Sequence, residues 1–286
     1  MKILITGAGG GIGKILLSKL IKNGYEDLFV LSRTNKEYGR NIKIVKGDLL
    51  NIASLTKALS GIDAVIHMAA LTHSSDPKKY FQINAEGTKN LLTASKEKNV
   101  KRFIFVSSRA AESGGGAYAE SKLIAEESVR QYAFEWIILR PAEIYGAKDD
   151  EALSKLINQI QKSFFIPVPG MGQSELAPLF ADDAVDAIIN SLNCPRANEI
   201  YTIAGPKTYS YNEIVELIAK SFNKKIIRIP VPTIILKTAG RFFPNHIVPD
   251  QIPRLFVKKS DDISLAQKYL NFNPKSFEEY LKNWLF

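Results

Sequence analysis

The first half of this chain alternates short β-branched runs with stretches of helical periodicity, and no other feature constrains its fold as strongly. Strands that alternate with helices are joined by crossover connections, which lay the strands parallel in one sheet. The runs FIFV and WIIL are apolar without interruption, as in strands that are covered on both faces. Because such crossovers are nearly always right-handed, we expect an α/β fold with a doubly wound parallel sheet.

The chain divides into two parts with different patterns. The first part contains the expected strands 2–6, 27–32, 42–48, 64–70, 102–108 and 134–141 and the expected helices 14–24, 54–61, 84–99 and 117–132. Beyond Tyr145, prolines and glycines become frequent, and we expect helices at 181–192 and 211–223 and a strand at 199–205. Asp182 and Asp183 are expected to cap the helix that they begin. The apolar segment 229–244 lies between prolines and is expected to pack inside this second part.

These patterns predict a Rossmann-type dinucleotide-binding domain at 1–150, completed by a return segment at 177–205. Residues 151–176 and 206–286 are then expected to form a smaller C-terminal lobe that binds the substrate. A lobe placed beside the sheet leaves a crevice for a small molecule.

Composition and charge limit the classes of function. Hydrophobic residues make up 45% and charged residues 23%, as in ordinary globular proteins, and a single cysteine, Cys194, excludes a disulfide within the chain. The net charge of +9 comes from dispersed lysines, so we expect no nucleic-acid partner. We find no signal-peptide pattern and no apolar run of roughly 18–20 residues, so a cytoplasmic protein without a membrane span is expected. His67, His73 and His246 are scattered, so no metal site is expected.

Residues 6–13 read TGAGGGIG and lie between the first expected strand and the first expected helix. The glycines that fall in phase are Gly7, Gly10 and Gly13. Gly7 would form the tight turn after the strand, Gly10 would admit a pyrophosphate, and Gly13 would let the helix pack on the sheet. Because backbone amides at a helix start bind phosphate, this loop predicts a nucleotide site.

This loop resembles the TGxxGxxG sequence of the extended short-chain dehydrogenase/reductases, which include epimerases, dehydratases and reductases of nucleotide sugars. Asp48 in KGDLLN, Asn84 in INAEGTKNLL and the stretches HMAA, LRPAEIYG and PLFADDAVDAI resemble further motifs of that family at its spacing. The final stretch, YLNFNPKSFEEYLKNWLF, resembles its closing segment, so the resemblance covers nearly the whole chain. It implies cofactor contacts at Gly7, Gly10, Gly11, Ile12, Gly13, Asp48, Leu49, Ala69, Ala70, Asn84, Tyr118, Lys122, Pro141 and Ala142.

The end of the second expected strand, VLSRT, bears on which dinucleotide binds. An acidic residue there usually hydrogen-bonds the adenosine 2′-hydroxyl, whereas an arginine accommodates a 2′-phosphate. Ser32 and Arg33 stand here without an acid, and a hydroxyl with a guanidinium suits the phosphate. We therefore expect NADP(H) rather than NAD(H); NAD(H) stays open because Arg33 can equally face solvent.

Tyr118-Ala-Glu-Ser-Lys122 carries the sharpest chemical signal in the sequence. Residues four apart share one helix face, so an ammonium at Lys122 would lower the pKa of the Tyr118 phenol. A phenol tuned towards neutrality can accept and return a proton at physiological pH. The family places a catalytic serine at the end of the preceding strand, and the matching residue is Ser108.

The resemblance implies hydride transfer between a nicotinamide and a substrate carbon, with Ser108, Tyr118 and Lys122 as the catalytic triad. Tyr118 would exchange the proton with the substrate oxygen, Lys122 would hold the nicotinamide ribose and tune Tyr118, and Ser108 would position the carbonyl. The substrate implied is a nucleotide sugar, and the reaction is a reduction or a 4-epimerisation.

Departures from the family pattern narrow this interpretation. The interval from Ser108 to Tyr118 is 118 − 108 = 10 positions, which is closer to atypical members than to sugar-nucleotide epimerases with a longer loop. Ser108 is not followed by the Thr-Asp-Glu triplet of the sugar 4,6-dehydratases, and Cys194 lies away from the expected site, which disfavours 3,5-epimerases. For His73 and for Arg109 two interpretations stay open: contact with the substrate, or an incidental, solvent-facing position.

Two other classes of function stay open. A non-catalytic dinucleotide-binding or assembly subunit would resemble the complex I accessory subunit among the atypical members, and segment 229–244 would then contact a partner or a membrane surface. The other class is a reductase of a non-sugar ketone. The resemblance also allows a homodimer through the helices 84–99 and 117–132. The sequence does not choose between epimerase and reductase.

Overall fold

A seven-stranded sheet forms the centre of the molecule. The computed structural model describes residues 1–34, 37–39, 41–147, 152–242 and 250–284. The sheet has the order β11-β6-β5-β4-β1-β2-β3, and every neighbouring pair is parallel. Its strands are β1 (Ile3–Thr6), β2 (Leu28–Ser32), β3 (Ile42–Lys46), β4 (Ala64–His67), β5 (Arg102–Val106), β6 (Glu135–Pro141) and β11 (Glu199–Ile203). The predicted doubly wound, Rossmann-type fold is confirmed.

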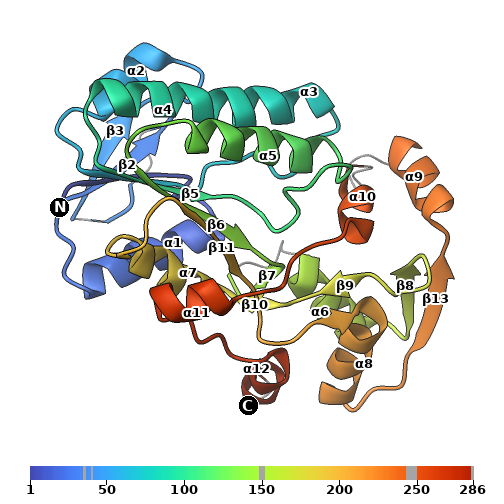
Figure 1. The fold of residues 1–286 in the computed structure, drawn as a ribbon. Coiled ribbons are helices and arrows are strands. Elements are labelled where there is room, and N and C mark those ends of the chain that lie inside the picture. Colours follow the sequence, from blue (N-terminus) through green and yellow to red (C-terminus); the bar gives the residue numbers. More distant parts are fainter. Residues whose placement is uncertain (35–36, 40, 148–151, 243–249, 285–286) are drawn as a thin grey trace.

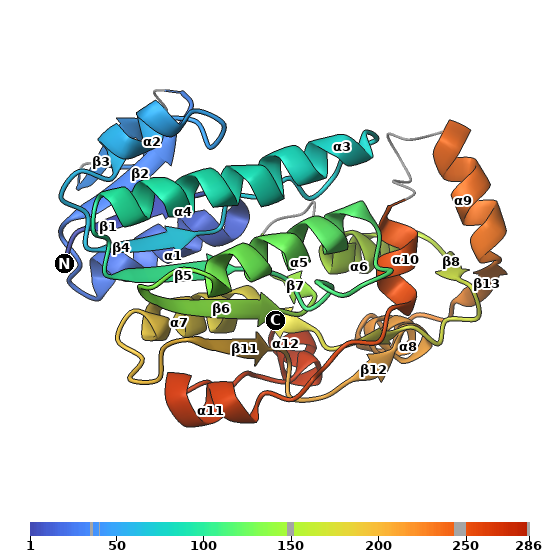
Figure 2. The same ribbon diagram turned by 45° about the horizontal axis from the view of Figure 1, so that its top comes forward.

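Helices cover both faces of the sheet (Figures 1 and 2). One face carries α1 (Gly11–Lys22), α7 (Ala181–Ser191) and α11 (Ser264–Leu270), and the other carries α2 (Ile52–Ala58), α4 (Gly87–Glu97) and α5 (Ala117–Arg130). Because side chains alternate along a strand, Ile3 and Ile5 of β1 enter the first core while Leu4 enters the second. The strand order reverses between β1 and β4, and ligands of such sheets bind at this switch point, outside the carboxyl ends of the strands.

A third hydrophobic core lies beside the sheet, in the C-terminal elements. It is built from α6 (Ala152–Lys162), β8 (Phe165–Pro169), α8 (Tyr211–Ser221) and α12 (Phe277–Trp284). Short strands β7 (Ile144–Tyr145), β9 (Glu175–Leu176), β10 (Leu179–Phe180) and β12 (Tyr209–Ser210) connect it to the sheet, and β13 (Ile227–Val231) pairs with β8. The remaining elements are α3 (Pro77–Tyr80), the π-helix η1 (Phe81–Glu86), α9 (Thr233–Phe242) and α10 (Gln251–Phe256).

Three expectations need correction. Segment 229–244 forms the end of β13 and α9, and Ile229, Ile234 and Ile235 are exposed rather than packed inside; residues 243 and 244 lie outside the described ranges. The helix expected at 84–99 begins earlier, since α3, η1 and α4 follow one another from Pro77. The N-cap of α7 is Phe180, without a side-chain hydrogen bond, because both aspartates lie inside the first turn.

The first-turn aspartates of α7 instead tie that helix to its neighbours. Asp182 pairs with Lys19 of α1 at 3.1 Å, and Asp183 accepts a hydrogen bond from the Lys275 amide at 2.9 Å. Within the described ranges, no helix has the length and apolar character that crossing a bilayer requires.

Candidate active site

The glycine loop turns directly against the segment that follows β4. Gly7 has a φ of +78°, and a Cβ there would lie 2.6 Å from the Ala69 amide nitrogen, so only glycine fits. A Cβ on Gly13 would lie 2.5 Å from the backbone of Ala8, so only glycine lets α1 come this close to the segment that follows β1. A Cβ on Gly10 would meet nothing closer than 3.4 Å, which leaves that side of the loop open.

The amino end of α1 is arranged to receive an anion. Its N-cap is Gly10, no side-chain hydrogen bond caps it, and its first turn contains no acidic residue. The first amides of a helix lack intrahelical partners and carry the positive end of the helix dipole. A diphosphate is therefore a suitable ligand for Gly11, Ile12 and Gly13.

Two adjoining cavities, of about 720 Å³ and 380 Å³, extend from this loop and share Gly7, Gly9, Ala69 and Ala70 in their walls. The larger one brings together the predicted residues Gly7, Gly10, Gly11, Ile12, Gly13, Ala69, Ala70, Tyr118, Lys122, Pro141 and Ala142. The smaller one brings together Gly7, Ser32, Arg33, Asp48, Leu49, Ala69 and Ala70. Of the predicted residues, Ser108 and Asn84 line neither cavity. An elongated dinucleotide fits a trough of this form.

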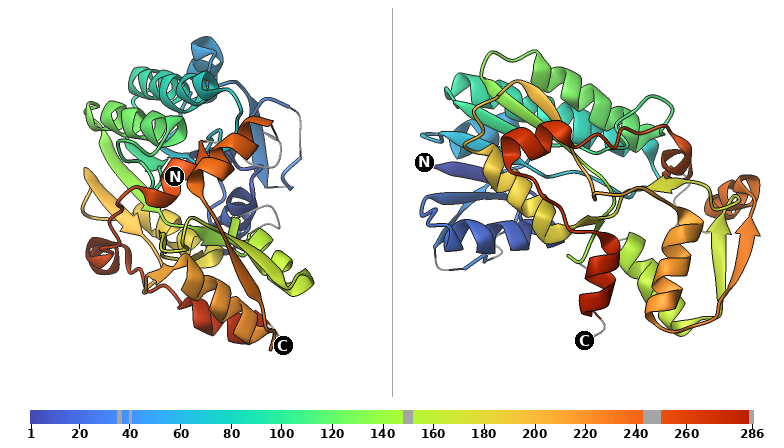
Figure 3. Two further views of the ribbon diagram at one scale, coloured as in Figure 1. Left: turned by 90° about the vertical axis from the view of Figure 1, so that its right-hand side faces the viewer. Right: turned by 60° about the horizontal axis from the view of Figure 1, so that its bottom comes forward.

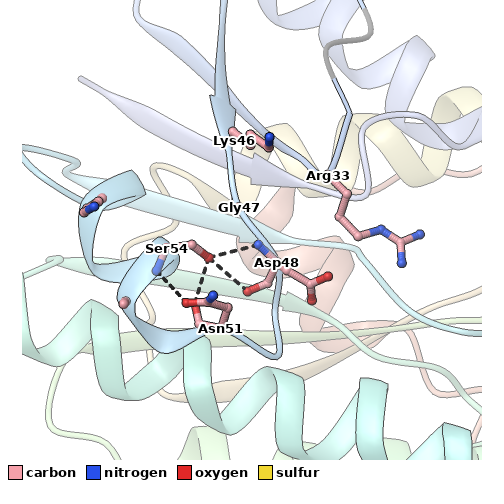
Figure 4. A pocket seen from close by; sticks show the side chains of 8 residues that line it. Arg33, Lys46, Gly47, Asp48, Asn51 and Ser54 are labelled. Carbon is pink, nitrogen blue, oxygen red and sulfur yellow. Dashed lines mark hydrogen bonds between the residues drawn. The ribbon is translucent and has the colours of Figure 1, made fainter.

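The strand-end residues lie at the far end of the smaller cavity. Figure 4 shows Arg33 extending beside Asp48 and Lys46 around a further cavity of about 440 Å³. Asp48 accepts a hydrogen bond from the Leu50 amide through Oδ1 at 2.9 Å, which fixes its carboxylate at this position. Arg33 is exposed and makes no ion pair with any described residue. Its guanidinium is thus open to an anionic group.

Asn84 and His67 are held entirely by protein groups. Asn84 Nδ2 donates to Leu71 O at 3.0 Å and to Ser121 Oγ at 3.1 Å, and its Oδ1 accepts from the Leu71 amide at 2.7 Å. His67 lies between the hydroxyls of Thr6 and Thr88, and burial lowers its pKa to about 3. Both side chains support the cavity wall from behind, through the loop after β4.

Ser108 lies near the phenol of Tyr118. Its side chain acts to lower the pKa of that phenol, and Ser108 Oγ accepts a hydrogen bond from the Ala110 amide at 3.1 Å. The neighbouring Ser107, which lines the larger cavity, instead donates to the buried Glu126 carboxylate. Ser107 is thus engaged with Glu126, and the role predicted for Ser108 stays a prediction.

Lys122 is buried and lies one helical turn beyond Tyr118. Its ammonium donates to the Val106 carbonyl at 2.8 Å and sits 4.1 Å from the centroid of the Phe105 ring. Burial lowers the pKa of Lys122 to about 7, although the charge of Glu126 raises it. At neutral pH this amine therefore exchanges its proton readily.

The cation nearest the Tyr118 ring is Arg254, not Lys122. The Arg254 guanidinium lies 4.0 Å from the ring centroid and lines the same cavity. Burial raises the pKa of the Tyr118 phenol, while the Arg254 charge and the nearby Ser108 side chain lower it. The expectation that Lys122 tunes this phenol thus misses the cation that packs over it.

Asp250 joins Arg254 to the start of α5. It pairs with Arg254, and its carboxylate accepts hydrogen bonds from the amides of Ala117 and Tyr118, the second at 3.3 Å. The N-cap of α5 is Gly116, which has no side chain, so Asp250 takes over the capping function. A Cβ on Gly116 would lie 2.6 Å from Asp250 Oδ1, which explains why glycine stands there. Sequence reasoning missed this pair because it lies more than a hundred residues from Tyr118.

The two residues left open in the sequence are now placed. Arg109 is buried and pairs with Glu143 at 2.7 Å and with Asp261, while Lys259 pairs with Glu143 at 3.1 Å. The alternative that Arg109 faces solvent is wrong, because its charge belongs to this ion-pair cluster. His73 is exposed and lines the larger cavity. In the part of the chain that the structure describes, no group of three His, Cys, Asp or Glu side chains is placed to hold a metal ion.

Comparisons with known proteins agree with this geometry. Residues 3–204 match the model of the NAD dependent epimerase/dehydratase family. The chain is similar to UDP-glucose 4-epimerase of Vibrio cholerae, at 26% identity over 95% of this chain and 90% of that protein. It is also similar to ceramide reductase of Caulobacter vibrioides, at 29% identity over 83% of this chain and 76% of that protein.

A solved structure shows the same fold. UDP-glucose 4-epimerase from Thermotoga maritima, determined with UDP-glucose, matches with a TM-score of 0.81 at 22% identity, over 100% of this chain and 97% of that chain. The family model covers most of the chain, from β1 to the residue after β11. The protein therefore belongs to the NAD-dependent epimerase/dehydratase family and is an NAD-dependent enzyme of the extended short-chain dehydrogenase/reductase type.

Proposed function

We propose that the enzyme reduces or 4-epimerises a nucleotide sugar by hydride transfer, with Ser108, Tyr118 and Lys122 as its catalytic residues. The observation that carries this proposal is the position of Tyr118, which has Ser108 close to its phenol and lines the cavity that the glycine loop also lines. The residues around that cavity fit a dinucleotide, because an uncapped helix start opens onto it. When bound, the dinucleotide supplies a nicotinamide that accepts and returns hydride.

The side chains divide the proton chemistry between them. As a sugar carbinol is oxidised, its carbon loses hydride and its hydroxyl loses a proton to the Tyr118 phenolate; in the reverse direction Tyr118 returns the proton. Ser108 donates a hydrogen bond to the same oxygen and stabilises charge on it. Lys122, with its pKa lowered to about 7, would hydrogen-bond the nicotinamide ribose of a bound dinucleotide without holding a full charge in the buried site.

Tyr118→Phe tests this assignment. We expect turnover on a panel of UDP-sugars and dTDP-sugars to fall by roughly a thousandfold, since a positioned acid–base group contributes about 10²–10⁴ in rate. Binding of the dinucleotide, followed by thermal shift, should persist. Tyr132→Phe is the matched control, because its hydroxyl bonds Thr93 away from the cavity. Normal turnover by Tyr118→Phe would show that another group moves the proton.

For the cofactor, we propose a preference for NADP(H) within this NAD-dependent family. Arg33 lines both cavities at the adenosine end, is exposed, and has Lys46 and Lys57 beside it. Arg33→Ala should lower the affinity for NADP⁺ roughly tenfold, the value of one charged hydrogen bond, and leave the affinity for NAD⁺ unchanged. Tighter binding of NAD⁺ by the unaltered protein would refute the preference.

A second candidate is a reductase of a lipid ketone, favoured by the similarity to a protein named ceramide reductase. Activity on a 3-ketolipid but on none of the nucleotide sugars would select it. A non-catalytic dinucleotide-binding subunit predicts thermal stabilisation by cofactor with no turnover of either class. The division of the chain into a dinucleotide-binding domain (1–150 with 177–205) and a substrate-binding lobe (151–176 with 206–286) stays a proposal. A homodimer through α4 and α5 is also a proposal, and sedimentation would test it.

A further inference from the structure

The two-stranded sheet β8–β13 presents an uncovered apolar face. Ile166 and Val168 of β8 are buried, the former in the third core, so the alternate residues Phe165 and Pro167 point the opposite way. The parallel register sets Phe165 beside Ile227 and Pro167 beside Ile229. Phe165, Ile227 and Ile229 are 58%, 57% and 45% exposed, which is unusual for three large apolar side chains on one sheet face.

Helix α9 continues this apolar surface. It follows β13 after a single residue, Pro232, and its Ile234 and Ile235 are 71% and 53% exposed. In Figure 1 the two strands and α9 form the right-hand edge of the molecule, and the left panel of Figure 3 looks onto that end. We call Phe165, Ile227, Ile229, Ile234 and Ile235 the end surface.

Cations outnumber acids around the end surface, although Glu216 of α8 lies near Arg228 and pairs with Lys220 at 2.7 Å. Between Glu216 and Asp250 the sequence has no acidic residue, and the cations with described side chains are Lys220, Lys224, Lys225 and Arg228. The segment 152–174, which includes β8, likewise contains lysines and no acid. Lys225 and Arg228 are exposed, and the Lys224 ammonium lies 4.6 Å from the centroid of the Phe164 ring.

The apolar side chains of the end surface and the cations near it together indicate what kind of partner binds there. A second copy of the chain is disfavoured, because a two-fold interface places the same patch on both sides and would bring like cations together. An anionic lipid bilayer offers both complements, an apolar layer for the isoleucines and phenylalanine and a phosphate layer for the lysines and arginine. We infer that the end surface docks the enzyme on the surface of an anionic membrane.

Docking of this kind is peripheral, since none of the described helices can span a bilayer. It also brings the membrane close to the candidate active site. Helix α10 carries Arg254 and ends at Phe256, whose ring is half-exposed. This ring packs against Gly170, the residue that follows β8: a Cβ placed on Gly170 would lie 3.6 Å from it. The end surface and the catalytic cavity therefore have α10 in common as a neighbour.

Co-flotation of the whole protein with lipid vesicles tests the inference. We expect the protein to float with vesicles of phosphatidylcholine plus phosphatidylglycerol, but not with phosphatidylcholine alone. Ile229→Ser with Ile235→Ser should reduce the bound fraction at least tenfold at limiting lipid. Lys225→Gln should reduce binding by roughly fivefold, and adding Arg228→Gln should reduce it further by a smaller factor, because Arg228 lies on the opposite face of β13 and near Glu216. All four side chains are exposed, so the variants should unfold at the temperature of the unaltered protein.

Matched controls separate this surface from general stickiness and general charge. Ile52→Ser removes an isoleucine that is 45% exposed on α2, as exposed as Ile229 but far from the end surface. Lys78→Gln with Lys79→Gln removes two exposed cations on α3. Neither control should change binding. The inference would be overturned if the protein did not bind anionic vesicles, or if the control variants lost as much binding as the end-surface variants. It would also be overturned if the protein self-associated and Ile229→Ser with Ile235→Ser abolished that self-association.

Discussion

Replacing Lys122 by methionine should change how the stability of the ligand-free protein depends on pH. Burial lowers the pKa of Lys122 from 10.5 to about 7. Between these two values the unfolded chain holds the proton while the folded chain has released it. Stability therefore rises with pH in this window, by about 1.4 kcal/mol per pH unit from this group, and is lost again as the pH falls towards 7. Across the whole window the effect amounts to roughly 4–5 kcal/mol.

Urea denaturation of both proteins at a series of pH values measures this effect. Lys122→Met keeps a long apolar side chain and cannot be charged, so it should exceed the unaltered protein in stability by several kcal/mol near pH 7. The difference should shrink steadily towards pH 10 and above. Lys96→Met, at an exposed position on α4, is the control and should follow the unaltered protein at every pH. A difference that does not vary with pH would refute the proposed burial of this charge.

Two further predictions concern α10 and the start of α5. Arg254→Met removes the cation 4.0 Å from the Tyr118 ring centroid; because that charge lowers the pKa of the phenol, the rising limb of kcat/KM against pH should move to higher pH, and an unmoved profile would contradict it. Gly116→Ala should lower the free energy of unfolding by about 1–2 kcal/mol more than Gly114→Ala. Both glycines have positive φ, but only a Cβ at Gly116 would collide with Asp250, so equal losses in urea denaturation would show that the contact does not matter.

The sheet and the glycine loop were predictable because their signals are local. The run FIFV, for instance, marks a strand covered on both sides, and it forms the last four residues of β5. Tyr118 and Lys122 share a cavity because four residues make about one turn of α5. Each of these conclusions needs only the periodicity of a single element.

The errors arose where distant segments meet. The sequence does not show that Arg109 is buried against Glu143 and Asp261, because its neighbours in the chain are small residues of a loop. Segment 229–244 is apolar enough to form a core, yet Ile229 and Ile235 are exposed. The sequence gives no sign that β13 pairs on one side only and that no described element covers its outer face.

By itself, then, the sequence determined a parallel sheet, a nucleotide loop at its first turn and a tyrosine and lysine on one helix face, since each depends on interactions within a few residues. Only the tertiary structure decided which charges surround that tyrosine. Arg254 and Asp250 reach α5 because α10 packs against its amino end, and that packing depends on the path of the whole C-terminal segment. The same packing left the β8–β13 face without a cover, because the third core is already filled from the other side of the sheet.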